Sequence, residues 1–258
     1  MLYWAAGVAL VVLAIRIIYR YQSGRCYSQR QLVGKTVVVT GASAGIGKEA
    51  ARDLARRGAR VILACRDTNK AQKVADDIMR TTGNRKVAVR KLDTSDLASV
   101  RKFARGILAT ETALHVLVNN AGIVGMTERK LTSDGLELTM ATNHFGHFLL
   151  TNMLLGVTAN SVHPGAVFTE IHLKEGGSSV YNLSLALLMM LMAKDEKLGA
   201  ETLIHLAVSE EVDGVTGKYF VDCKESNTSD LAKDQVLAKK LWSTSERLVK
   251  LKPEETHY

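Results

Sequence analysis

Proline and cysteine are both scarce in this chain of 258 residues. The three cysteines, Cys26, Cys65 and Cys223, are odd in number and show no Cys-x-x-Cys spacing, so neither a disulfide framework nor a zinc site is indicated. A reducing compartment fits this usage best. The two prolines, Pro164 and Pro253, mark no linker, and we find no repeat or low-complexity segment. We therefore expect one large α/β domain.

Acidic residues are missing from the stretch between residues 16 and 48, where the basic residues are concentrated. The whole chain carries a formal charge of +8, which alone fits a nucleic acid, an anionic lipid or an anionic cofactor. The six basic residues of this stretch are Arg16, Arg20, Arg25, Arg30, Lys35 and Lys48. They directly follow an uncharged, mostly apolar segment, so the placement favours a membrane surface, and we expect no nucleic-acid partner.

The apolar N-terminal segment lacks the two marks of a cleaved signal peptide, a basic region before the run and a small-residue cleavage site after it. If Arg16 extends toward the lipid headgroups, a helix over residues 1–19 spans about 28 Å, close to a thin bilayer of about 27 Å. We therefore predict a transmembrane anchor over residues 1–19. The positive-inside rule then places residues 35–258 in the cytosol, where the sequons at Asn182 and Asn227 stay unglycosylated.

A glycine-rich turn follows a short β-branched run. Residues 36–40 read Thr-Val-Val-Val-Thr, Gly41, Gly45 and Gly47 come next, and a helix is predicted from near Lys48. Strand, glycine turn and helix follow in the order that a pyrophosphate site requires, because glycines allow close approach and the helix start favours negative charge. A plain tight turn is the alternative, which this position disfavours.

The end of the next strand favours NADP(H) over NAD(H). The predicted helix stops at Gly58, and residues 60–65 form a continuous apolar strand typical of a parallel sheet. An NAD site places an acid at the end of this strand to bind the ribose hydroxyls, whereas here Arg66 follows it. An arginine pairs with a 2′-phosphate; a solvated arginine is the alternative. We interpret Asp67 as the N-cap of the next helix.

Strands and helices continue to alternate beyond this unit. We predict helices over residues 69–80 and 97–110 and strands over residues 86–92 and 114–118. This alternation is typical of a doubly wound, mostly parallel sheet. Asp93 ends the strand over residues 86–92, on the edge that faces the ligand in open α/β sheets.

Three motifs together resemble the short-chain dehydrogenase/reductase family, and within it most of all the retinol dehydrogenase branch. They are residues 40–47 (Thr-Gly-Ala-Ser-Ala-Gly-Ile-Gly), 119–122 (Asn-Asn-Ala-Gly) and 143–150 (Asn-His-Phe-Gly-His-Phe-Leu-Leu). The resemblance implies a Rossmann-like fold. It also implies a cofactor site formed by Gly41, Ser43, Gly45, Ile46, Gly47, Arg66, Asp93, Asn119, Ala121 and Gly122, with Asp93 on the adenine. It makes Asn143 the helix asparagine of the catalytic tetrad.

His144 and His147 lie three residues apart on a predicted helix. That spacing is compatible with metal binding, but no third ligand is evident, and the family motif explains both residues as packing. We predict no metal site.

One segment of the family pattern is absent. After Leu155 the chain passes directly to Gly156 and soon reaches Pro164-Gly165, whereas the family has a strand ending in the catalytic Ser and then a helix with Tyr-x-x-x-Lys. No lysine here has a tyrosine four residues earlier. Reduction of a carbonyl needs an acid that protonates the developing alkoxide, and one positioned acid contributes roughly 10²- to 10⁴-fold. We expect little or no dehydrogenase activity, with Asn143 the only tetrad member retained.

The deletion near residues 155–156 removes a whole βα unit. We predict that the next strand takes the vacated position through another right-handed crossover, which gives a sheet one strand narrower. The missing helix commonly mediates association in this family, so its loss exposes apolar surface and leaves the oligomeric state open. A skipped exon, a defective gene model and an evolved pseudoenzyme all produce this pattern.

The C-terminal part completes the expected domain. By resemblance, Pro164, Gly165 and Thr169 flank the nicotinamide of the cofactor. The apolar residues 180–193 are interpreted as a buried helix, or alternatively as a lid that receives a lipid-like substrate. Residues 199–208 are predicted to form a helix and 217–221 a last strand. Residues 229–251 are predicted to form an amphipathic closing helix.

Two classes of function remain open for the chain. The resemblance implies an NADP(H)-dependent oxidoreductase of retinol, retinal or similar lipophilic alcohols and aldehydes. It also implies that the membrane is that of the endoplasmic reticulum. The missing segment favours a non-catalytic membrane-bound protein that binds NADP(H) or a partner, or a truncated isoform without stable function.

Overall fold

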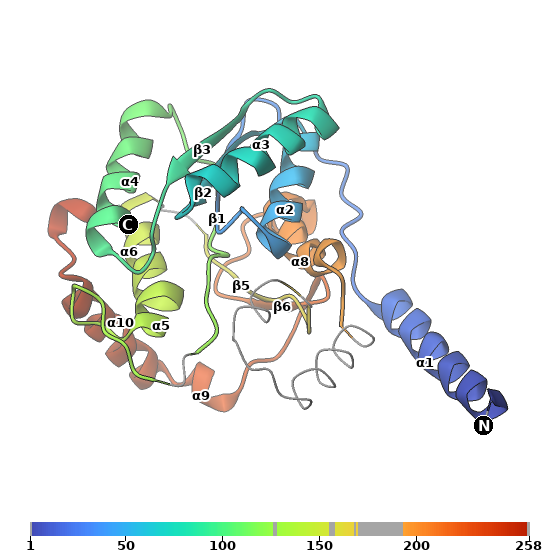
Figure 1. The fold of residues 1–258 in the computed structure, drawn as a ribbon. Helices are drawn as coiled ribbons and strands as arrows, with labels where there is room; N and C mark the ends of the chain where they lie inside the picture. The colour runs from blue at the N-terminus through green and yellow to red at the C-terminus, as the bar shows by residue number, and fades with distance from the viewer. Residues whose placement is uncertain (1, 126–127, 155–157, 168, 170–192, 257–258) are drawn as a thin grey trace.

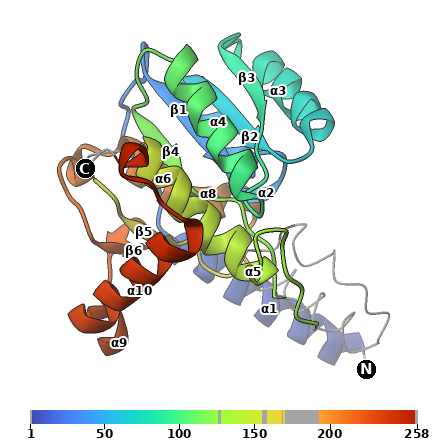
Figure 2. The same ribbon diagram turned by 90° about the vertical axis from the view of Figure 1, so that its left-hand side faces the viewer.

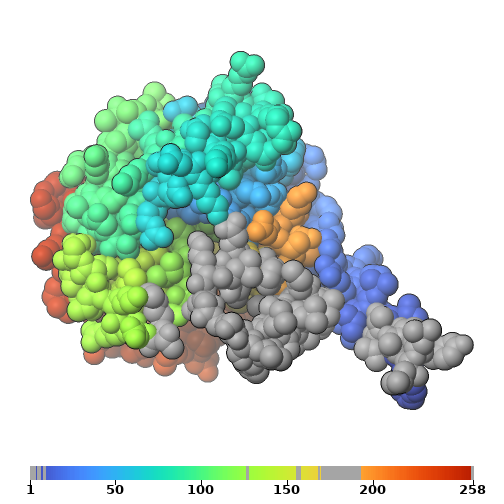
Figure 3. All heavy atoms as spheres, in the orientation of Figure 1, coloured from blue at the N-terminus to red at the C-terminus, as the bar shows by residue number. Residues whose placement is uncertain are grey.

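The computed structural model describes all of the chain except residues 1, 126–127, 155–157, 168, 170–192 and 257–258. Figures 1 and 3 show a compact body from which α1 (Leu2–Gln22) projects. Within the described residues, no helix is long and apolar enough to cross a membrane. Most of the predicted apolar helix over residues 180–193, like the junction at residues 155–156, lies outside the described residues.

A four-stranded parallel sheet forms the centre of the body, in the order β3-β2-β1-β4. Its strands are β1 (Thr36–Thr40), β2 (Arg60–Cys65), β3 (Val87–Lys91) and β4 (Val116–Val118). In β1, Val38 lies opposite Ile62 of β2 and Leu117 of β4. All four strands were predicted from their apolar, β-branched runs, and β1 and β2 have the predicted bounds. β1 and β2 are buried on both faces, as expected for the centre of a parallel sheet covered by helices, whereas β3 at the edge is only partly buried.

Helices cover both faces of this sheet, as the doubly wound prediction requires (Figure 2). Because side chains alternate along a strand, Val37 and Val39 enter one core and Val38 enters the other. The first core receives α2 (Gly45–Arg56), α3 (Thr68–Thr82) and α8 (Glu196–Val208). The second receives α4 (Leu97–Thr110), α6 (Gly146–Leu154) and the end of α10 (Gln235–Val249).

The strands that follow β4 in the sequence form a second sheet. β5 (Ser161–His163) pairs in parallel with β6 (Tyr219–Val221), and β6 pairs antiparallel with β7 (Lys224–Glu225). Among the described residues, β4 forms a ladder only with β1, and β5 only with β6. The prediction of one continuous, narrower sheet is therefore wrong.

The physical reason lies in the packing of β5 on its other neighbours. β5 keeps its ladder with β6 and its contacts with α8, and α8 packs along α2 in the first core. Pairing β5 with β4 would require β5 to move away from these partners and would break the contacts. The described strands therefore form two sheets instead of one narrower sheet.

The C-terminal segment is helical but interrupted. Asp234 separates α9 (Asp230–Lys233) from α10 and caps α10 by accepting hydrogen bonds from the backbone amides of Val236 and Leu237. The amphipathic pattern was predicted correctly, but most of the apolar face of α10 is uncovered, since Leu241 is 53% exposed. The remaining short elements are α5 (Leu138–Met140), η1 (Ala141–Phe145), η3 (Glu210–Val212) and η4 (Pro253–Glu255).

Candidate cofactor site

The glycine turn lies at the carboxyl end of β1 and leads directly into α2. Gly41 and Gly45 adopt φ angles of +66° and +60°, a region that favours glycine. A Cβ on Gly41 would lie 2.7 Å from Ala121 Cα, and one on Gly47 would lie 2.3 Å from Asn120 Nδ2. The turn is therefore packed against the loop that follows β4. Helix α2 starts at Gly45, three residues before the predicted start near Lys48, so two of the glycines belong to its first turn.

A buried threonine that sequence reasoning missed connects these two loops. The Thr40 hydroxyl oxygen accepts hydrogen bonds from the backbone amides of Asn120 and Ala121, each at 2.9 Å. It also lies 3.0 Å from His147 Nε2, while His147 Nδ1 lies 3.3 Å from the Asn143 carbonyl oxygen. The available signal was a threonine that ends a strand immediately before a glycine turn.

His147 has a hydrogen-bond partner at each ring nitrogen. Burial lowers the pKa of His147, so the ring is neutral near pH 7. Nδ1–H is assigned as the donor to the carbonyl of Asn143, which leaves Nε2 as an acceptor 3.0 Å from the Thr40 hydroxyl. The oxygen of that hydroxyl already accepts from two amides, and its proton has a second acceptor in the Val118 carbonyl at 3.3 Å. A chain of hydrogen bonds therefore runs from the glycine turn to the backbone of Asn143. The other histidine of the motif, His144, contacts the Ser245 hydroxyl through Nε2 at 2.9 Å.

Asn143 lies in the π-helical turn η1, a feature often found at functional sites. Its side chain is exposed, accepts a hydrogen bond from the Ile123 amide and donates one to the Ile123 carbonyl, both at 2.9 Å. A Cβ on Gly122 would lie 3.4 Å from Asn143 Oδ1. The structure thus brings Asn143 and Gly122 together beside β4. Asn119 points toward α6, where its Nδ2 donates to the Thr151 hydroxyl.

The segment after β5 returns to the glycine turn. Thr169 Cγ2 lies 3.4 Å from the position that a Cβ would take on Gly45. A Cβ on Gly199 would lie 2.7 Å from Val167 and 3.3 Å from Ile46, so this segment is held between α2 and α8. Thr169 and the glycine turn therefore lie close enough to contribute to one site.

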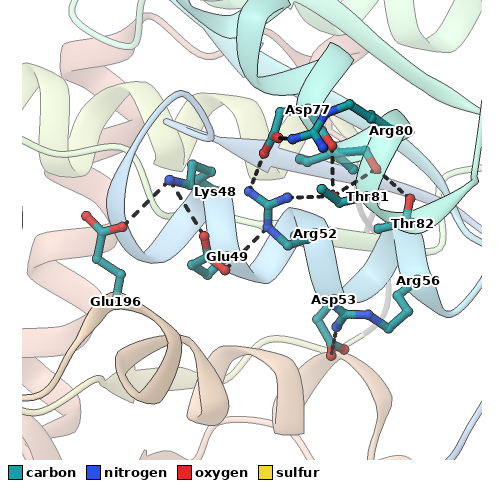
Figure 4. A network of polar contacts seen from close by, with 11 residues as sticks. Lys48, Glu49, Arg52, Asp53, Arg56, Asp77, Arg80, Thr81, Thr82 and Glu196 are labelled. Atoms are coloured by element: carbon teal, nitrogen blue, oxygen red, sulfur yellow. Dashed lines mark hydrogen bonds and ion pairs between the residues drawn. The ribbon is translucent and has the colours of Figure 1, made fainter.

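A carboxylate that the sequence did not reveal also lies at this turn. Glu196, at the start of α8, has Oε1 4.0 Å from the Cβ position of Gly45 and Oε2 4.0 Å from Lys48 Nζ. Figure 4 shows Lys48 between Glu196 and Glu49, whose Oε1 lies 3.7 Å away. Glu196 therefore puts negative charge beside the amides that would receive a phosphate.

The remaining candidate residues lie at the ends of β2 and β3. Arg66 is exposed directly after β2, and Asp67 caps α3 as predicted by accepting a hydrogen bond from the Lys70 amide. Asp93 accepts hydrogen bonds from the amide and hydroxyl of Ser95 at 3.0 and 2.7 Å.

Ser43, inside the glycine turn, contacts the thiol of Cys65 at the end of β2. Burial raises the pKa of this thiol, and the hydrogen bonds from the turn oppose the rise only in part. Cys65 is therefore a packing residue beneath the turn and is not a reactive thiolate.

Comparison with known proteins identifies the family of the chain. The family profile described as short chain dehydrogenase matches residues 35–169. Human retinol dehydrogenase 11 is 38% identical over 86% of this chain and 88% of its own length, and bovine retinol dehydrogenase 12 is 38% identical over 92% and 93%. Human retinol dehydrogenase 13 is 35% identical over 88% of each chain.

Solved structures show the same fold. An uncharacterized protein from Mycobacterium paratuberculosis superposes with a TM-score of 0.65 at 30% identity, covering 89% of this chain and 98% of that one. A short-chain type dehydrogenase/reductase from Mycobacterium marinum gives a TM-score of 0.54 at 20% identity, covering 74% and 94%. Fold, glycine turn and relatives together show that this chain belongs to the short-chain dehydrogenase/reductase family and is similar to the retinol dehydrogenases.

Proposed function

We propose that this chain binds NADP(H) at the carboxyl edge of its parallel sheet and has little or no dehydrogenase activity of its own. The observation that carries the proposal is the convergence of Gly41, Gly45, Gly47 and Thr169 at the start of α2. The backbone amides at a helix start bind phosphate without any charged side chain. In this site the glycine turn holds the pyrophosphate, and Thr169 contacts the nicotinamide end.

Two observations support impaired catalysis. No tyrosine precedes a lysine by four residues anywhere in the chain. The alignment with human retinol dehydrogenase 11 extends over 285 positions but covers only 86% of this chain of 258 residues. Several tens of the aligned positions in the relative therefore have no counterpart in this chain. Without the tyrosine and its lysine, the chain lacks the groups that in this family protonate the alkoxide formed when a carbonyl accepts hydride. Asn143 alone does not supply that proton.

Cofactor preference is proposed to depend on Arg66, which pairs with the 2′-phosphate. We would titrate the chain with NADPH and NADH and follow nicotinamide fluorescence. NADPH is expected to bind more tightly, and Arg66→Gln should weaken NADPH binding roughly 10- to 100-fold, the size of a charge-assisted hydrogen bond, without affecting NADH. The matched control is Arg85→Gln, because Arg85 is exposed at the opposite, amino-terminal edge of the sheet. Equal affinity for the two cofactors would contradict the preference.

The substrate class of the intact family site is proposed to be a lipophilic alcohol or aldehyde such as retinol or retinal, since the relatives named above are retinol dehydrogenases. A non-catalytic role in which the bound cofactor stabilises a partner-binding form is the second candidate. It is favoured by the uncovered apolar face of α10, where Leu237 is 44% exposed and Leu241 is 53% exposed. Activity in the absence of any partner would argue against it.

We also propose that α1 anchors the chain in a membrane, with the domain facing the cytosol. Among the described apolar side chains of α1, Trp4 is 83% exposed and Leu10 is 67% exposed, so the body leaves these two largely uncovered. Flotation with liposomes tests this directly. The full chain should float, and a chain without residues 2–22 should remain in the aqueous fraction. Glycosylation at Asn227 in microsomes would place the domain in the lumen and contradict the orientation.

A further inference from the structure

Lys194 is a lysine whose side chain is almost completely buried. Its side chain is 1% exposed, and its ammonium lies 2.5 Å from Asp222 Oδ1, where Asp222 is 39% exposed. Burial of an ammonium is unfavourable unless a carboxylate pairs with it. The buried ammonium of Lys194 therefore depends on the carboxylate of Asp222.

The side chain of Lys194 lies against the Pro164-Gly165 turn. A Cβ on Gly165 would lie 2.9 Å from both Cε and Nζ of Lys194, and Gly165 has a φ of +85°. The backbone of Lys194 is bound to the same segment, since its amide donates to the Ala166 carbonyl at 2.8 Å and it forms a parallel bridge with Val167. Lys194 thus supports the turn through both its backbone and its side chain.

Asp222 links this turn to the segment that leaves α1. It lies in the tight turn between β6 and β7 with a φ of +51°. Its Oδ1 accepts a hydrogen bond from the Gly24 amide at 2.9 Å, and a Cβ on Gly24 would lie 2.0 Å from the Asp222 carbonyl oxygen. Burial alone would raise the pKa of Asp222, but the hydrogen bonds from Lys194 and Gly24 outweigh it and lower the pKa, so the carboxylate stays ionised at neutral pH.

A second ion pair connects the same two segments. Arg20, in the last turn of α1, lies 2.6 Å from Asp195, the residue after Lys194. This pair is about half exposed and contributes little stability alone. Together with the contact between Gly165 and Lys194, it brings the end of α1, the start of α8 and the Pro164-Gly165 turn close to the Lys194–Asp222 pair.

We propose that Lys194 and Asp222 are positioning residues for the nicotinamide end of the cofactor site. Their ion pair fixes the Pro164-Gly165 turn and couples it to the segment that follows α1. The inference rests on the proposed binding of NADP(H). Lys194 is not offered as a substitute proton donor, because its ammonium is buried beneath the turn and bound to Asp222.

The test compares NADPH with 2′-phospho-ADP-ribose, which carries the adenine, pyrophosphate and 2′-phosphate but lacks nicotinamide. Asp222→Asn should weaken NADPH binding about tenfold, the scale of one lost charge-assisted hydrogen bond, and leave the affinity for 2′-phospho-ADP-ribose nearly unchanged. The matched control is Glu255→Gln, which makes the same chemical change in the pair that Arg101 forms at 2.7 Å on α4. The control should lower the melting temperature without changing the ratio of the two affinities. Equal weakening of both ligands by Asp222→Asn would overturn the proposal.

A second variant keeps the test decisive if Asp222→Asn alone unfolds the chain by leaving a buried ammonium unpaired. The double variant Lys194→Met/Asp222→Asn removes both charges, which is often tolerated in a protein interior. It should fold and still show the selective loss of NADPH affinity. A double variant that binds both ligands like the wild type would overturn the positioning role.

Amide hydrogen exchange separates failure of this inference from failure of cofactor binding. Without any ligand, the double variant should exchange the backbone amides at positions 24 and 194 faster than the wild type, while Glu255→Gln should not. If the wild type binds neither ligand, the proposed function is wrong, and exchange alone then decides whether the pair couples the two segments. Unchanged exchange at both amides would overturn the coupling.

Discussion

Neutralising Glu196 should strengthen NADPH binding. The Glu196 carboxylate lies 4.0 Å from the Cβ position of Gly45, at the turn where the amides of α2 would receive the pyrophosphate. A phosphate bound there meets like charge from α8, and Glu196→Gln removes this repulsion while it keeps the size and shape of the side chain. The predicted direction is unusual, since most substitutions at a binding site weaken the ligand.

The magnitude follows from the charges around the turn. Two unit charges about 6 Å apart interact by roughly 3 kcal/mol at an effective dielectric constant of about 20. Lys48, 4.0 Å from Glu196, offsets much of this repulsion, and solvent screens more of it because the Glu196 side chain is 31% exposed. A net gain of about 1 kcal/mol is expected, which is about a fivefold lower Kd.

The assay is a fluorescence titration of NADPH at two ionic strengths, with Glu210→Gln as the control for net charge. Glu210 pairs with Arg30 on another part of the surface, and its neutralisation should leave the Kd unchanged. The advantage of Glu196→Gln should shrink at high salt because partly exposed charges are screened. An unchanged or higher Kd for Glu196→Gln would refute the placement of the pyrophosphate at this turn.

Three further predictions concern the fold. Gly146→Ala should cost at least about 3 kcal/mol in urea unfolding, because its Cβ would lie 2.0 Å from a backbone carbonyl oxygen, whereas Gly106→Ala in α4, with no atom nearer than 3.9 Å, should gain about 0.5 to 1 kcal/mol. Burial lowers the pKa of His147, so below about pH 6.5 the unfolded chain binds a proton at this residue more readily than the folded chain. The free energy of unfolding should therefore fall between pH 7 and pH 5, and His147→Gln should make this fall less steep. Leu241→Ala should cost less than about 0.5 kcal/mol because the side chain is 53% exposed, and Val249→Ala, which is fully buried, should cost about 2 kcal/mol. Equal costs within either pair, or an unchanged slope, would contradict the packing described.

The sequence predicted those parts of the fold whose signals are local. The run over residues 36–40 matches β1, and the segment over residues 97–110 matches α4 with Asp96 as its N-cap. Short β-branched runs and capping residues carry this information within a few positions. The start of α2 was misplaced because glycine is a poor helix former and gives no sign that a helix has begun.

The divided sheet and the polar partners of the site were beyond local patterns. Whether β5 joins β4 depends on its ladder with β6 and on the position of α8, which are contacts between distant segments. Glu196 reaches the glycine turn, and Lys194 reaches Asp222, only because α8 packs along α2 and beside β6. Thr40 is different, because the sequence shows it directly before the glycine turn. Its role as an acceptor for the amides of the loop after β4 was nevertheless not predicted.

Reduction of retinal by NADPH tests the central claim most directly. The purified chain would be compared with a version that carries a strand ending in Ser and a helix with Tyr-x-x-x-Lys inserted between Leu155 and Gly156, after both have been shown to bind NADPH. The restored version is expected to oxidise NADPH at least about 10²-fold faster than the purified chain, which is the contribution of a positioned acid. Comparable rates in the two proteins would contradict it and would require a proton donor elsewhere in the chain.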